Sequence, residues 1–202
     1  TTGFGVETRK EAIKSTNLGN RDRVLTGIFL EQLVNFGSKV DLRAGVYSNY
    51  YSEYGWKHFP GAELGVQATT DLRLYSGYAI SYRIPTYNDL YYVGPTNIGN
   101  DQLQPEQAQN FEIGAKWSKS GIFAELVYFY RSTDNLIEWT RPDEDTPWQP
   151  QNFSEVKFNG IEASLNYRVR PNGSTVRVKE FNLSYNYISA DLINQPGIET
   201  RY

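Results

Sequence analysis

Residues 110–131, with the sequence NFEIGAKWSKSGIFAELVYFYR, contain two alternating segments joined by a short turn. Apolar residues occupy every second position of 111–117 and of 122–130, and Glu112, Lys116 and Glu125 stand between them. A period of two is the pattern of a β-strand whose two faces meet different surroundings. The stretch therefore predicts an antiparallel hairpin that turns at 118–121.

The same alternation recurs along the chain and predicts an all-β fold of about nine antiparallel strands. The other seven are expected at 3–12, 24–36, 40–47, 63–69, 72–83, 161–168 and 181–187. Short connections are expected at 36–39, 69–71, 118–121 and 171–174, and long polar connections near 52–60, 84–106 and 132–153. All tight turns would then lie at one end of the sheet. Short turns at one end and long loops at the other are typical of outer-membrane β-barrels.

Composition supports a barrel and leaves one alternative. The chain contains 16 tyrosines, and such amphipathic rings collect at membrane interfaces. Tyr82 and Trp117 are expected in the two aromatic girdles that bound an apolar band. The longest apolar run is only 126–130, far short of the ~20 residues of a transmembrane helix. A tyrosine-rich soluble sandwich would show the same alternation, with its polar positions in water.

Several kinds of site are excluded or unsupported. The chain has no cysteine, which excludes disulfides and thiolate metal sites, and its net charge of −3 argues against a nucleic-acid surface. His58 is the single histidine, and no nucleophile-elbow or phosphate-loop motif accompanies it. The acidic run 143–145 lacks the spacing of a calcium loop and is interpreted as a solvated loop tip. No cofactor or metal is expected in this chain.

The region between the strands at 72–83 and 110–117 carries a recognisable series of residues. Arg83, Pro85, Leu90 and Tyr91 are followed by an Asn100-to-Glu106 element and then by a Phe-Glu-Ile-Gly strand. The second and third elements contribute Leu103, Pro105, Glu106, Glu112 and Gly114. This order and spacing resemble the TonB-dependent outer-membrane receptors. Segments 128–137 and 152–162 resemble the next two elements of that family. The sequence of 89–100 is most similar to that of cobalamin (vitamin B12) receptors of Bacteroidetes type.

The resemblance implies more than the residues themselves show. It implies a bacterial outer-membrane barrel of 22 strands with an N-terminal plug and a TonB box. Its partners would be TonB, outer-membrane lipid, a surface lipoprotein and a large scarce nutrient such as cobalamin. Residues 1–202 would be a single partial barrel domain from a longer protein, because the plug, the TonB box and the C-terminal strands are not recognised in it. Any calcium bound by the parent receptor cannot be assigned to residues of this chain.

Two sets of residues are candidates for function. Pro85 is expected to end a strand, whereas Arg83, Glu112, Lys116, Glu125 and Arg131 share the inferred lumen side and would form ion pairs or a substrate relay. The loop aromatics could form a platform for a planar ligand such as a corrin ring, or pack the loops together. They are Tyr87, Tyr91, Tyr92, Trp139 and Trp148, with Arg201 added from the position of basic residues in cobalamin receptors.

Transport of a corrinoid is the leading hypothesis. Receptors of the same family for siderophores, haem or glycans are the nearest alternatives. From other classes, an outer-membrane barrel enzyme would have to be built around His58, and a soluble carbohydrate-binding sandwich would use the surface aromatics. We do not expect an enzyme.

Overall fold

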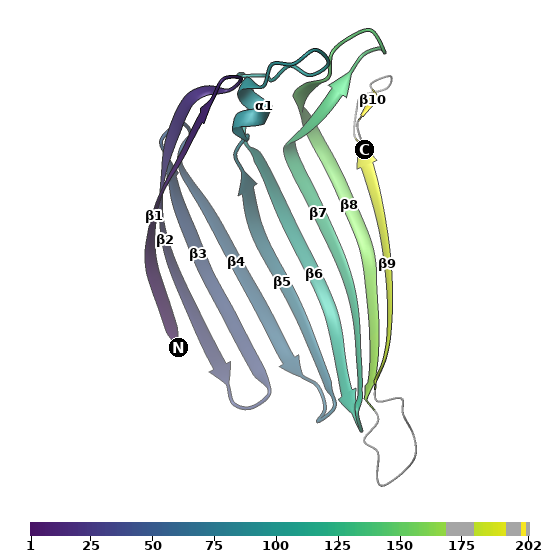
Figure 1. Ribbon diagram of the computed structural model, residues 1–202. Helices are drawn as coiled ribbons and strands as arrows, with labels where there is room; N and C mark the ends of the chain where they lie inside the picture. The colour runs from purple at the N-terminus through teal and green to yellow at the C-terminus, as the bar shows by residue number, and fades with distance from the viewer. Residues whose placement is uncertain (169–179, 193–198, 201–202) are drawn as a thin grey trace.

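A computed structural model describes residues 1–168, 180–192 and 199–200 of the chain and shows one antiparallel sheet of ten strands (Figure 1). Each of the first eight strands pairs with the next in sequence, and the short β10 pairs with β7. The strands are β1 (Thr2–Ser15), β2 (Gly19–Phe36), β3 (Val40–Tyr51), β4 (Gly55–Gln67), β5 (Leu72–Arg83), β6 (Glu106–Lys119), β7 (Ile122–Arg141), β8 (Gln149–Arg168), β9 (Glu180–Leu192) and β10 (Glu199–Thr200). A short helix, α1 (Tyr87–Tyr91), lies between β5 and β6.

The sheet is curved, and β1 and β9 lie at its opposite edges (Figure 1). No helix among the described residues is long and apolar enough to cross a membrane. The nine predicted strands are confirmed, although several extend further than the alternation indicated. The extra residues are mostly polar and lie at strand ends, where side chains no longer need an apolar surrounding on one face.

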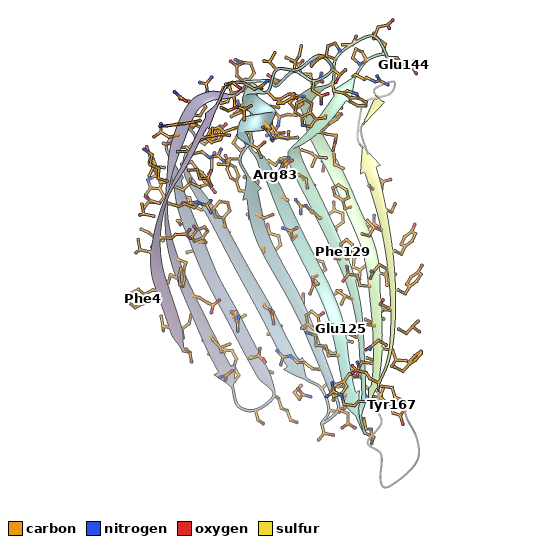
Figure 2. The ribbon with its side chains drawn as sticks, in the orientation of Figure 1. Phe4, Arg83, Glu125, Phe129, Glu144 and Tyr167 are labelled. Carbon is orange, nitrogen blue, oxygen red and sulfur yellow. The ribbon has the colours of Figure 1, made fainter. Side chains whose placement is uncertain are left out.

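The strand register separates two faces. Arg73, Lys116 and Glu125 stand opposite one another across β5, β6 and β7, and the neighbouring row holds Leu74, Ala115 and Leu126. In Figure 2, Glu125 and Phe129 lie on the concave face, whereas Phe4 points away from it. The convex face is apolar yet exposed. Its exposed aromatic and aliphatic side chains include Phe4, Ile28, Leu30, Ile113, Leu126, Tyr128, Ile161, Leu183 and Tyr185.

The expected arrangement, with short turns at one end of the sheet and long loops at the other, is correct for only part of the sheet. The lower end, at the bottom of Figure 1, has short turns such as 37–39 and 120–121. The upper end carries the long segment 84–105, as predicted, but also the tight turns 16–18 and 52–54. The long loop expected at 52–60 is therefore wrong, because β4 begins at Gly55. The loop expected at 132–153 shrinks to 142–148, since β7 and β8 both run 20 residues. The turn expected at 171–174 lies outside the described residues.

Strands β4 and β5 separate near the upper end. Their pairing stops at Gly61 and Ala79, although both strands continue beyond this point. The amide of Gln67 donates to the carbonyl of Lys39, the residue before β3, so Gln67 faces β3. Alternate residues of a strand face the same neighbour, and Pro60 therefore faces β5. Proline has no N–H to donate, which removes a bond of this ladder where the pairing ends.

The separation explains one wrong prediction. Tyr82 was expected to belong to an outward aromatic girdle, but its ring packs 5.8 Å from both Tyr51 and Phe59. Its hydroxyl oxygen is buried. Trp117 remains 36% exposed on the convex face, where the girdle prediction placed it.

Candidate functional site

The segment 84–105 folds back over the upper end and begins with α1. Thr86 caps this helix: its hydroxyl accepts from the Asp89 amide at 3.1 Å, and the Asp89 carboxylate accepts from the Thr86 amide at 2.9 Å. Such a reciprocal capping box satisfies backbone donors that the first turn leaves open. The other carboxylate oxygen of Asp89 accepts from Trp139 Nε1 at 3.1 Å. The helix is thereby attached to β7.

Arg83 and Glu106 close the base of this segment. The guanidinium of Arg83 donates to both carboxylate oxygens of Glu106, at 2.8 and 2.6 Å, and also to the Ile137 carbonyl at 3.2 Å. Glu106 is almost fully buried and accepts from the Ile137 amide at 2.7 Å. A bidentate pair of this kind fixes geometry as well as charge. Arg83 lies near the upper end of the concave face, as Figure 2 shows.

The uncharged residues of the Arg83-to-Glu106 series form a small core beneath α1. Leu90 and Leu103 are 5% and 2% exposed and pack with Ile137, and Tyr91 covers them. Pro85 is fully buried, and Pro105 is buried as well. Asn152 supports the same core by accepting from the Gln104 amide and donating to its carbonyl, both at 2.8 Å. These contacts give the motif a structural role in holding the loop base.

The remaining residues of the series, Gly114 and Glu112, lie on the concave face of the sheet. A Cβ on Gly114 would lie 2.4 Å from the Tyr75 ring, so the glycine leaves room for that ring. Tyr75 in turn donates to Glu125 at 2.8 Å, and Lys116 pairs with Glu125 at 3.3 Å. Glu112 stands on the same concave face, in the row of Glu63 and Gly77. The predicted inward ion pairs are present for Arg83, Lys116 and Glu125, whereas Arg131 donates to the Thr133 hydroxyl.

Arginines cover two of the loop aromatics proposed as a ligand platform. Tyr87 and Tyr91 stack 6.4 Å apart, with Arg23 4.8 Å from the ring centre of Tyr87 and Arg21 3.9 Å from that of Tyr91. Burial raises the pKa of Tyr87, so its phenol is neutral at physiological pH. These two rings pack the loop against β2 through cation–π contacts.

The other members of the platform lie apart. Trp148 lies under Arg141, at 4.7 Å, and its backbone exchanges hydrogen bonds with residues 96 and 98. Trp139 is held by Asp89, as described above. Tyr92 is the exposed member, at 37%. Arg201 lies outside the described residues. The structure thus brings Tyr87 and Tyr91 together and does not gather the whole set around one surface.

Sequence reasoning missed the partners that β1 and β2 supply. Asn17, in the turn between them, accepts from the Val93 amide at 3.0 Å and donates to its carbonyl. Arg23 donates to the Pro85 carbonyl at 2.9 Å and pairs with Glu11 at 2.6 Å. No local signal indicates the contacts of Asn17 with Val93 and of Arg23 with Pro85, because they join residues 76 and 62 positions apart. The Thr-x-x-Asp spacing at 86–89, in contrast, is a capping-box signal that was available.

The acidic side chains and the single histidine were considered as metal ligands. Among residues 1–168, 180–192 and 199–200, no three His, Asp or Glu side chains are arranged to hold a metal ion. His58 Nδ1 lies 2.8 Å from the Ser48 hydroxyl, and its ring stacks on Trp56 on the convex face. In the 143–145 tip, Asp143 accepts from the Thr146 hydroxyl at 2.7 Å, which lowers the pKa of Asp143.

Comparison with known proteins identifies the family. A family model described as the β-barrel of TonB-dependent receptor-like proteins matches residues 2–200. The chain belongs to the TonB-dependent receptor β-barrel family. The vitamin B12 transporter BtuB of Photobacterium profundum is 23% identical over 193 residues, which is 93% of this chain and 30% of that protein.

Solved structures of the family share the fold. The siderophore receptor PirA from Pseudomonas aeruginosa matches with a TM-score of 0.80 at 18% identity, over 94% of this chain and 36% of that one. The copper transporter OprC matches with a TM-score of 0.72 at 14% identity, over 95% and 34%. The chain therefore spans about a third of the length of these relatives. Its curved sheet is a portion of a TonB-dependent receptor barrel wall, and the relatives are receptors and transporters.

Proposed function

We propose that the chain is part of a bacterial outer-membrane receptor that takes up a large scarce nutrient, with a corrinoid such as cobalamin as its ligand. The observation that carries the proposal is the similarity to a vitamin B12 transporter across 93% of the chain. The concave face would line the lumen, and the upper end with its long segment would face the cell exterior. In the full-length receptor, TonB would supply energy coupling, and a surface lipoprotein could act as a further partner.

A receptor for a siderophore, haem or a glycan is the second candidate. The fold is shared with a siderophore receptor and a copper transporter, so the barrel wall by itself fits several cargoes. The ligand contacts proposed for Tyr87, Tyr91, Tyr92, Trp139, Trp148 and Arg201 stay part of the corrinoid proposal. Of these, Tyr92 offers the most exposed ring.

The test is a calorimetric titration of cyanocobalamin into the full-length receptor in detergent, with and without calcium. Calcium is varied because any calcium bound by the full-length receptor is not assigned to residues of this chain. Saturable binding supports the corrinoid assignment. Absence of binding by a folded barrel contradicts it and leaves the other cargoes of the family.

A further inference from the structure

A cleft of about 580 Å³ opens at the upper end between the β1–β2 turn and the segment 84–105. Its volume falls within the ~300–1,000 Å³ of small-molecule sites. One wall is made by the turn and the start of β2, and the other by the loop and the first residue of β8. The lining residues on which the argument depends are Asn17, Arg21, Tyr91, Tyr92, Asp101 and Gln149.

The walls of this cleft are fixed by contacts described above and by one glycine. Asn17 ties the turn to Val93, and Arg21 lies on Tyr91 while its Nε donates to the Leu18 carbonyl at 3.2 Å. A Cβ on Gly99 would come within 2.8 Å of the Leu90 backbone, so the loop folds this tightly only with glycine. Because these contacts already hold the walls in place, little conformational entropy is lost when a ligand binds.

The cleft is lined by polar side chains whose formal charges sum to zero. Among the described lining residues, Arg21 and Asp101 are the only charged ones, and their charges cancel. Within the described part of the chain, neither the terminal nitrogens of Arg21 nor the side-chain amide of Gln149 makes a hydrogen bond. The cleft therefore offers donors from Arg21, acceptors from Asp101 and both from Gln149, beside the exposed ring of Tyr92.

We infer that this cleft binds the periphery of a neutral ligand rich in amide or hydroxyl groups. Arg21 donates to a ligand oxygen, Asp101 accepts from a ligand N–H or O–H, and Tyr92 supplies a flat apolar surface. A ligand with several negative charges would meet no excess of positive charge here, which disfavours anionic ferric chelates. The inference rests on the proposed function and deepens it, because cyanocobalamin is neutral and carries peripheral amides.

The experiment compares cyanocobalamin binding by the full-length receptor and three variants in detergent. Hydrogen bonds to charged groups contribute about 1.5–3 kcal/mol, so Arg21→Gln and Asp101→Asn should each weaken binding roughly tenfold or more. Asp101→Asn keeps the size of the side chain and does not disturb the stack on Tyr91. Glu144→Gln makes the same acid-to-amide change at an exposed loop tip outside the cleft and should leave the affinity unchanged.

The outcomes separate the cleft from the receptor function. Cyanocobalamin binding that is equally tight in wild type, Arg21→Gln and Asp101→Asn overturns this inference and leaves the proposed function standing. No saturable binding by the folded wild type overturns both. Tight binding of ferric enterobactin in place of cyanocobalamin also overturns both, because an anionic chelate would then be the preferred ligand.

Discussion

The two faces of the sheet follow different rules. On the concave face, charged side chains bridge strands, as in Arg73–Asp41 at 2.7 Å and Lys116–Glu125 at 3.3 Å. On the convex face, Leu126 and Tyr185 are 56% and 60% exposed. A sandwich would bury such a face against a second layer, but the described residues form one sheet. The contrast is the one expected of a barrel wall with an apolar face toward lipid and a charged face toward water.

The difference between the two faces becomes smaller toward the upper end of the strands. Charged pairs also occur on the convex parity, for instance Lys10–Asp22 and Lys157–Glu155, at 2.9 and 3.1 Å. Both lie toward the upper end of their strands, beyond the apolar positions. The convex face thus becomes polar where a barrel wall leaves the hydrocarbon region.

The largest expected effect comes from removing a charge on the concave side. Arg83→Ala leaves Glu106 buried without its cation, and breaking such a pair should cost about 3–5 kcal/mol of unfolding free energy. Urea unfolding of the full-length receptor in detergent measures the change. Arg9→Ala is the matched control, because the exposed Arg9–Glu11 pair should contribute less than about 1 kcal/mol. Equal effects would show that Glu106 does not depend on Arg83.

Adding a charge to the convex face comes next. Leu126→Lys places an ammonium group on the apolar face and should cost about 2–4 kcal/mol if Leu126 faces the middle of the bilayer. Ser164→Lys puts the same residue on the concave face opposite Glu125, where the cost should be small. Folding equilibria of the two variants in lipid vesicles give the comparison. A larger loss for Ser164→Lys would reverse the assignment of the faces.

A smaller effect is expected from two glycines on the concave face. Gly114→Ala forces the Tyr75 ring from its place and weakens its bond to Glu125, at a cost of about 1–2 kcal/mol. Gly77→Ala is the control, because the added carbon would meet the Ala62 carbonyl at an ordinary 3.8 Å. Thermal unfolding of both variants in detergent distinguishes them. Similar losses of stability in the two variants would mean that the backbone conformation of glycine, and not the Tyr75 ring, explains why glycine is needed at position 114.

The smallest effect concerns the loop tip. The pKa of Asp143 is lowered by the hydrogen bond from Thr146, so its contribution is present above the ordinary aspartate pKa and is lost as the pH falls through the lowered value. Fluorescence of the nearby Trp148 should change over this acid range in wild type and not in Asp143→Asn. Glu144→Gln should behave as wild type. An identical transition in all three proteins would assign it to another group.

Much of the wall could be predicted from sequence, because alternation reports directly which side chains share a face. Glu125 and Leu126 were assigned to opposite faces on this basis, and the register agrees. The same reasoning failed for Tyr82, since strands β4 and β5 separate beyond Gly61 and let its ring turn toward Tyr51. Alternation also failed at 52–60 and 132–153, where strands continue with polar residues that resemble a loop.

The upper end was predictable only in part. The Arg83-to-Glu106 series includes residues that contact one another at the base of the loop, namely Arg83 with Glu106 and Leu90 with Leu103. Arg21, Arg23 and Asn17 were missed, since they reach this loop from β2 and from the turn before it, across a long sequence separation. A single sequence contains no local pattern for such contacts, and the cleft that they form emerges only from the fold.

The two-faced wall is tested most directly by single cysteines along β7, each carrying a spin label, in the full-length receptor reconstituted in lipid. Residues 1–202 contain no cysteine that would compete for the label. We predict that labels at Ala124, Leu126 and Tyr128 are accessible to oxygen, and labels at Phe123, Glu125 and Phe129 to a water-soluble nickel complex. Uniform access of the nickel complex to all six positions would contradict a lipid-facing surface and the barrel wall with it.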